Sequence, residues 1–246
     1  MNSNSQAASD GNNSHERQVM VWDGADQLEG VLSIPAGARA LVVFAYVRMG
    51  NAEQIPDALN TLADGMRQEG LATLSVNLLT AENEALDKAT GFFRENVSVL
   101  HQRILGITNW IIANPATQSI NIGYVGVGVS AAAALAAAAI RPDAIHAVVA
   151  VDPRFDLVSS YLPRLVARTL VISGERNTQA LDMSRQAFPQ LASDTKLDIV
   201  REARERGLAN TLEAIPGVAN VFENEQSLQK VAQLAIWWFT HYLSAR

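Results

Sequence analysis

The chain has 246 residues, a formal net charge of −6 and 48% hydrophobic residues, which is enough apolar material to build one sizeable core. The acidic balance gives no electrostatic reason to bind nucleic acid or an anionic membrane surface. No cysteine is present, so disulfides, thiolate metal sites and a cysteine nucleophile are excluded. We expect a soluble, cytoplasmic protein with no cofactor and no metal.

The chain divides into a short tail and one domain. Residues 1–16 are rich in Asn, Ser, Ala and Gly and lack an apolar core, which predicts a disordered N-terminal tail and not a secretory signal. The most apolar stretch, residues 130–140, is too short to span a bilayer. Because there is neither an internal repeat nor a second core, we expect residues 17–246 to form a single domain without membrane association.

Strands and helices are predicted to alternate along the domain. Segments 18–22 and 28–34 predict an antiparallel hairpin, and the apolar run 40–45 predicts a strand that is buried on both faces. The elements that follow are a helix ended by Gly70, a strand over 71–78, a helix over 92–113, a strand and a helix around Gly128, strands over 147–151 and 169–173, and helices over 179–191 and 227–242. This order predicts an α/β fold with a mostly parallel central sheet and helices on both faces.

The segment 122–135 carries the most informative local pattern. It reads Ile-Gly-Tyr-Val-Gly-Val-Gly-Val-Ser and continues into an alanine-rich run. A strand, a tight turn and a helix in this order are the context of a nucleophile elbow, where G-x-S-x-G holds a serine at the apex. Small residues flank the apex because the two backbones nearly touch. Gly126 and Ser130 take the flanking positions, so Gly128 stands at the apex.

With this elbow, the chain resembles the dienelactone hydrolase-like branch of the α/β-hydrolases over most of residues 18–244. The order and spacing of its segments carry the resemblance, namely 41–45, 70–74, 78–80, 109–110, 122–143, 162–164, 169–174, 215–217, 221–223 and 238–239. The resemblance implies the α/β-hydrolase fold. In active members it also implies ester hydrolysis by a serine, a histidine and an acid.

At the positions of that triad, however, this chain has other residues. Gly128 aligns with the serine, Asn177 in the turn Gly-Glu-Arg-Asn with the acid, and Asn220 in the loop Pro-Gly-Val-Ala-Asn with the histidine. Glycine offers no nucleophile, and asparagine cannot take up a proton near neutral pH. The resemblance therefore implies a protein that lacks serine hydrolase activity, with no catalytic residue at these positions, and that acts as a small-molecule- or protein-binding module.

An active carboxylic-ester hydrolase is the alternative, and it needs another constellation. A shift of the elbow by two residues makes Ser130 the nucleophile, and Asp152, just after the strand 147–151, becomes a displaced acid. The structural interpretations are that Ser130 caps or opens the helix and that Asp152 opens a turn. No histidine stands at the position of the base. The sequence does not distinguish a natural loss of activity from an engineered variant of an active parent.

Loops at the carboxyl ends of the strands predict a pocket for a small polar or anionic ligand. Its expected residues are Tyr46, Arg48, Val129, Ser130, Asn177 and Asn220. Arg48 would supply the charge and a planar set of donors; the alternative is that Arg48 is solvated. The segment 192–209 has apolar residues at helical spacing among charged ones, which predicts an added amphipathic helix. Its apolar face either packs on the domain or forms a contact with a protein partner or a second copy.

Overall fold

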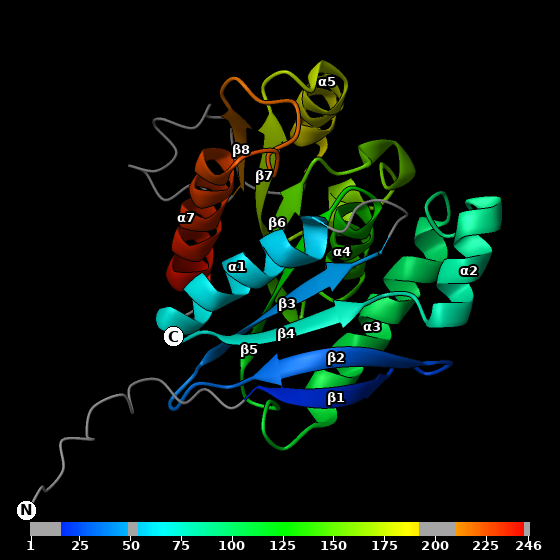
Figure 1. Cartoon of the computed structure of the whole chain (residues 1–246), viewed down its shortest axis with the longest axis vertical. Coiled ribbons are helices and arrows are strands. Elements are labelled where there is room, and N and C mark those ends of the chain that lie inside the picture. The colour runs from blue at the N-terminus through cyan, green and yellow to red at the C-terminus, as the bar shows by residue number, and fades with distance from the viewer. Residues whose placement is uncertain (1–15, 49–53, 192–209, 244–246) are drawn as a thin grey trace, which may run out of the picture.

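The strands of the protein form one twisted sheet (Figure 1). The computed structural model describes residues 16–48, 54–191 and 210–243. The strands in this part of the chain are β1 (Arg17–Trp22), β2 (Gln27–Ser33), β3 (Ala40–Tyr46), β4 (Ala72–Asn77), β5 (Asn121–Val127), β6 (Ile145–Val151), β7 (Arg168–Gly174) and β8 (Asn210–Ile215). Their order is β1-β2-β4-β3-β5-β6-β7-β8. The pairs β1–β2 and β2–β4 are antiparallel and all other neighbours are parallel, which confirms the predicted hairpin and the mostly parallel sheet.

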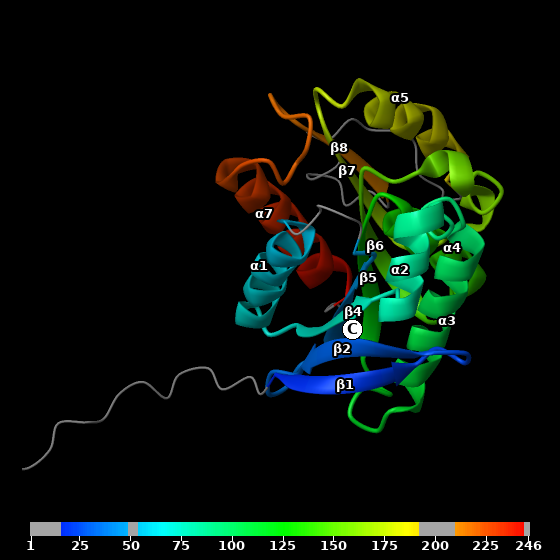
Figure 2. The same ribbon diagram turned by 45° about the vertical axis from the view of Figure 1, so that its right-hand side comes forward.

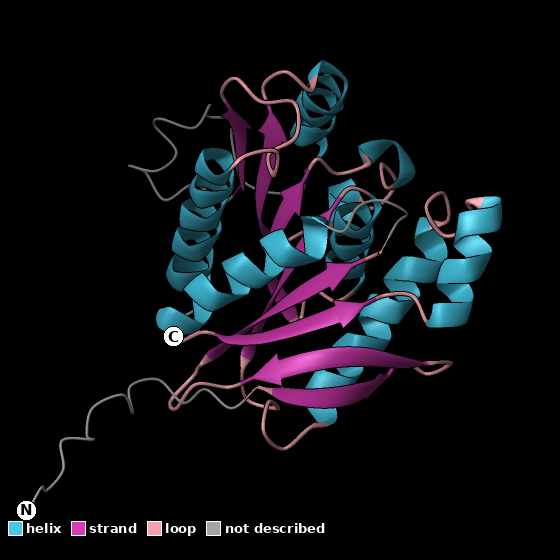
Figure 3. Cartoon of the chain, viewed as in Figure 1, coloured by secondary structure: helices cyan, strands magenta, loops and turns pink. Residues whose placement is uncertain are grey.

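Helices cover both faces of this sheet, as predicted (Figures 2 and 3). They are α1 (Gln54–Gln68), α2 (Ala81–Thr90), α3 (Val97–Ala113), α4 (Val129–Ile140), α5 (Thr178–Ala187) and α7 (Glu225–Tyr242). Helices α1 and α7 pack on one face, where Phe44 and Trp238 are buried. Helices α3 and α4 pack on the other, around Leu100 and Leu135. Each face of the sheet thus has its own apolar core, as the doubly wound architecture requires.

The predicted helix over 92–113 begins five residues later than expected, as α3. Before it lies α2, which the sequence analysis did not predict. Thr80 caps α2 by accepting from the Asn83 amide at 3.2 Å, and Gly91 ends it in the left-handed conformation. The buried carboxylate of Asp87 then accepts the backbone amide of Phe93 at 2.8 Å, and this bond holds the chain in a turn. Because that turn occupies the residues after Gly91, α3 begins only at Val97.

The C-terminal edge of the sheet also differs from the prediction. Strand β8 pairs with β7 in parallel, although residues 210–215 carry no strong strand pattern: Asn, Glu and Ala are all uncommon in strands. The predicted amphipathic helix over 192–209 and nearly all of the predicted tail lie outside the described residues, and the proposed contact through 192–209 stays a prediction. Within the described residues, no helix is both long enough and apolar enough to cross a membrane.

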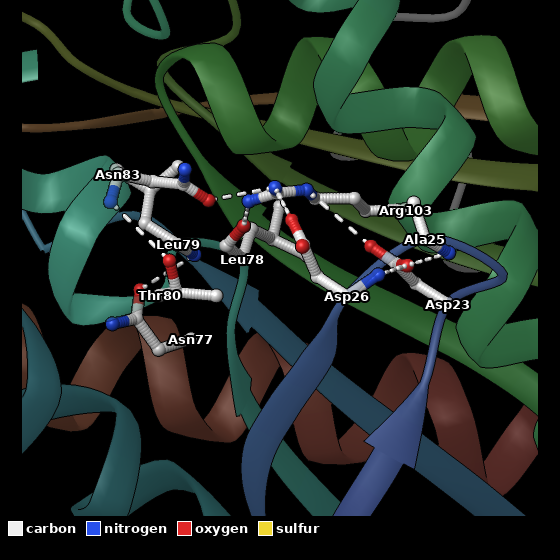
Figure 4. A network of polar contacts seen from close by, with 9 residues as sticks. All are labelled: Asp23, Ala25, Asp26, Asn77, Leu78, Leu79, Thr80, Asn83 and Arg103. Carbon is white, nitrogen blue, oxygen red and sulfur yellow. Dashed lines mark hydrogen bonds and ion pairs between the residues drawn. The ribbon is translucent and has the colours of Figure 1, made fainter. Parts of the chain in front are cut away.

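A buried arginine fastens the N-terminal hairpin to the helices (Figure 4). Arg103 on α3 bonds to the backbone oxygen of Leu78 and the carboxylate of Asp26, and to Asn83 Oδ1 at 2.7 Å. Its Nε lies 3.4 Å from Oδ2 of Asp23, whose side chain is only 2% exposed. The hairpin turn, the end of β4 and the start of α2 therefore share one cation, and none of them is free to shift alone.

Candidate functional site

The elbow lies at the carboxyl end of β5, where ligands bind in open α/β sheets. Strand β5 ends at Val127, α4 begins at Val129, and Gly128 between them has φ 59° and ψ −120°. A Cβ added at Gly126 would lie 2.6 Å from the backbone nitrogen of Ala131, so only glycine fits that flank. A Cβ added at Gly128 would meet no atom within 4 Å. The structure thus places Gly128 at the apex, with open space above it.

The hydroxyl of Ser130 is committed to the turn itself. Its Oγ accepts the amide of Val127 at 3.0 Å and donates to the carbonyl of the same residue at 2.9 Å. The serine is 1% exposed, and Val129 before it is 3% exposed. Neither residue is open to a ligand in this conformation, so the two central members of the predicted pocket are buried within the elbow.

Asp152 follows β6 and lies beside the apex. The amide of Gly128 donates to the carbonyl of Val151 at 2.9 Å, which brings the ends of β5 and β6 together. Asp152 has φ 43°, the one positive value among the non-glycine residues described, in a region that L residues rarely adopt. Its Oδ1 is buried with no donor in hydrogen-bonding geometry. Such a combination of backbone strain and an underused carboxylate is typical of functional positions.

The residues around Asp152 come from β7 and the loop after it. Burial raises the pKa of the Asp152 carboxyl above its ordinary value, against the lowering effect of the nearby Ser173 hydroxyl, the Asn177 side chain and the Gly174 amide. The hydroxyl of Ser173 is itself buried without a hydrogen-bond partner. Asn177, which the sequence analysis aligned with the family's acid, therefore lies next to a carboxylate that follows the neighbouring strand β6.

Asn177 and Asn220 both use their side-chain oxygens locally. Asn177 caps α5 by accepting from the Ala180 amide at 3.3 Å. Asn220 is exposed, and its Oδ1 accepts the amide of Phe222 at 2.9 Å. The loop that carries Asn220 rests on the end of β7, since a Cβ added at Gly174 would lie 2.6 Å from the backbone oxygen of Ala219. The two asparagines thus belong to adjoining loops.

Tyr46 and Arg48 lie at the carboxyl end of β3, beside a carboxylate that the sequence analysis did not include. They follow β3 and gather with Glu84 at the start of α2, where Arg48 Nη1 lies 3.9 Å from Glu84 Oε1. Burial is the largest influence on the Tyr46 phenol and raises its pKa. Tyr46, Arg48 and Glu84 line a cavity of about 320 Å³, and the elbow residues are not among those that line it. The single pocket of six residues stays a prediction.

Glu84 and Asn77 are members of this second cluster that sequence reasoning missed. The amide nitrogen of Asn77 donates to the Glu84 carboxylate. A helix N-cap at Thr80 followed by acidic residues was the signal that could have located Glu84.

Two of the described histidines, His101 and His146, are placed where they supply no base at the elbow. His101 is buried in α3, where its Nδ1 lies 3.2 Å from the carbonyl of Val97, and burial lowers its pKa. His146 lies near the start of β6, at the opposite end of that strand from Asp152. Among the residues described, no three His, Asp or Glu side chains are grouped to hold a metal ion.

Strand order, helix placement and a glycine-rich elbow after β5 define an α/β-hydrolase fold. No model of a known protein family matches the chain. A crystal structure of dienelactone hydrolase from Anabaena variabilis is 36% identical, with a TM-score of 0.82 over 93% of this chain and 98% of that one. This chain belongs to the dienelactone hydrolase family. A dienelactone hydrolase-like promiscuous phosphotriesterase from metagenomic libraries, at 16% identity and a TM-score of 0.65 over 92% and 98% of the two chains, shares the fold.

Two curated relatives carry a different name. Both are Mycobacterium tuberculosis proteins called "Putative phosphoribosyl transferase", and each is 31% identical over 228 residues. The match covers 93% of this chain and 47% of each relative. The chain therefore spans about half the length of the curated relatives that it matches.

Proposed function

We propose that this protein is a dienelactone hydrolase family member that binds a ligand or a protein partner without serine hydrolase chemistry. One observation carries the proposal: Gly128 occupies the turn between β5 and α4, and the hydroxyl of Ser130, two residues further on, is hydrogen-bonded to both backbone polar groups of Val127. A triad works as a unit, and loss of its serine or histidine alone costs about 10⁶ in turnover. Here glycine and asparagine stand at all three positions.

A fluorophosphonate probe tests this proposal directly, because it labels only an activated serine. We expect no adduct by intact mass on the native protein or on Ser130→Ala. The positive control is a related serine hydrolase labelled under the same conditions. An adduct on the native protein that disappears in Ser130→Ala would overturn the proposal and would move the nucleophile to the first turn of α4.

Hydrolysis without a serine nucleophile is the second candidate, and Asp152 is the observation that favours it. A partly buried carboxyl with a raised pKa, beside an apex with open space, is suited to accept a proton from water. Ester hydrolysis that persists in Ser130→Ala, resists the fluorophosphonate and is lost in Asp152→Asn would establish this candidate. We expect instead no hydrolysis above that of Asp152→Asn.

Phosphoribosyl transfer, the activity in the names of the Mycobacterium tuberculosis relatives, is not part of the proposal. Those proteins are about twice the length of the segment that this chain matches.

A further inference from the structure

The outer face of the N-terminal hairpin is not covered by a helix in the described part of the chain. Met20 and Trp22 on β1 are 52% and 53% exposed there, while Val21 between them points into the core on the α3 side. The cavity of about 320 Å³ opens on this face and reaches the ends of β3 and β4. Its size is at the lower end of the range for small-molecule pockets, about 300–1,000 Å³.

Polar side chains from four separate elements meet in this cavity. They are Gln18 from β1, Gln27 and Glu29 from β2, Asn77 from β4 and Glu84 from α2. Most ligand pockets are largely apolar with a few polar groups, so a lining of amides and carboxylates favours a ligand that is polar over most of its surface.

The polar groups at the inner end of the cavity are held in place before any ligand arrives. Asn77 accepts the amide of Leu79 through Oδ1 at 3.3 Å and donates to Glu84 through its nitrogen. Glu84 lies in the first turn of α2, whose start Thr80 fixes. A site that is organised beforehand loses less entropy on binding than one that must be assembled.

The charges around the cavity select against anions. Glu29 and Glu84 both line the cavity. Burial raises the pKa of the Tyr46 phenol, Arg48 lowers it, and the two glutamates raise it further. Among the described residues that line the cavity, Arg48 is the one cation, and Glu84 already lies 3.9 Å from it. An anion would therefore meet two carboxylates and one partly neutralised guanidinium, whereas hydroxyl groups can donate to the carboxylates and accept from Arg48 and the amides.

We propose that this cavity is the ligand site of the protein and that it takes a neutral, hydroxyl-rich molecule of monosaccharide size. The proposal deepens the binding role given above and rests on it. The cavity shares Tyr46 and Arg48 with the pocket predicted from the sequence. Its other polar contacts come from Glu29, Asn77 and Glu84, and not from the loops that carry Asn177 and Asn220.

Side-chain amide signals in NMR titrations test the proposal, with glucose as the neutral probe, glucosamine as the cation and a phosphorylated glucose as the anion. We expect glucose to shift the amide signals of Gln18, Gln27 and Asn77 most strongly. Replacing Glu29→Ala removes a charged acceptor and should weaken glucose binding about tenfold. Glu69→Ala, which removes an exposed carboxylate outside the lining, is the matched control and should bind like the native protein.

Four results would overturn the assignment: no shift of these amides with any of the three probes, tighter binding of the phosphorylated sugar than of glucose, tighter binding of glucosamine than of glucose, or unchanged affinity in Glu29→Ala. These failures are distinct from failure of the proposed function. A fluorophosphonate adduct would refute the absence of hydrolase chemistry and leave a measured glucose site standing. Side-chain amide signals that do not shift with any probe would refute the cavity assignment, but they would not affect the proposal that the protein lacks serine hydrolase chemistry.

Discussion

Gly128→Ala should destabilise the protein, although the added methyl group touches nothing. The backbone at Gly128 has φ 59°, where a non-glycine residue carries strain of about 1–3 kcal/mol. The substitution also lowers the conformational entropy of the unfolded chain, and this stabilises the folded state by about 0.4–1 kcal/mol. With no atom within 4 Å of the new Cβ, no packing term enters. The net expected loss in the free energy of unfolding lies between about 0 and about 2.6 kcal/mol, with a central value of about 1.3 kcal/mol.

Two other glycines calibrate this value. Gly70 at the end of α1 has φ 76° and equally open space around its Cα, so Gly70→Ala should lose a similar amount. At Gly126 an added Cβ would lie 2.6 Å from a backbone nitrogen of α4, which no side-chain rotation relieves. Gly126→Ala should therefore cost at least as much as the upper end of the range for overpacked cores, about 3 kcal/mol.

Urea unfolding monitored by circular dichroism measures all three variants, with unchanged m-values as the condition for comparing them. In thermal scans, each kcal/mol corresponds to about 2–4 °C for a chain of this size. If Gly128→Ala is instead more stable than the native protein by about 0.4–1 kcal/mol, the residue has an ordinary negative φ. The apex would then lie elsewhere, and the argument from the missing nucleophile would collapse.

Three further variants probe the surroundings of the site. Arg103→Met leaves the buried carboxylate of Asp23 without its cation and should cost about 3–5 kcal/mol in urea unfolding, whereas Arg141→Met breaks an exposed pair and should cost under about 1 kcal/mol; equal losses would refute the fastening role. Ser130→Ala removes two hydrogen bonds to the end of β5 and should cost about 1–3 kcal/mol, while a neutral result would free its hydroxyl for other roles. Because the folded pKa of Asp152 is raised, the native state binds its proton more tightly and loses stability as pH rises from about 4; the stability of Asp152→Asn relative to native should therefore grow between acidic and neutral pH, and a difference that does not change with pH would contradict the shift.

The fold was predictable because its signals are local and mutually consistent. The valine-rich run before Gly128 and the alanine run after it identify β5 and α4 without any long-range contact. Strand β8 was missed because its existence depends on pairing with β7, which no pattern within residues 210–215 announces. The late start of α3 was missed because it depends on Asp87, whose carboxylate accepts backbone amides that lie six and seven residues ahead.

The candidate site was harder to predict, since it depends on where side chains point. Position along the chain placed Tyr46 and Arg48 at the carboxyl edge of the sheet correctly, but the same edge extends along six parallel strands. Their side chains turn towards the hairpin and Glu84, because α2 brings a carboxylate to that side. Helix α2, which the sequence analysis did not predict, therefore determines that Tyr46 and Arg48 lie on the hairpin side of this edge.

Asp152 and Gly128 both have a positive φ, which strains the backbone of a residue with a side chain but not that of glycine. At the apex, glycine removes the strain that a serine would have to bear. One strand away, an aspartate keeps a positive φ and a carboxyl whose burial opposes its charge. Glycine or asparagine at Asp152 would relieve one or both costs. A chain that had lost all use for this edge has no physical reason to hold the more expensive residue there. The retained strain therefore makes Asp152, and not Ser130, the first residue to mutate if ester hydrolysis is ever detected.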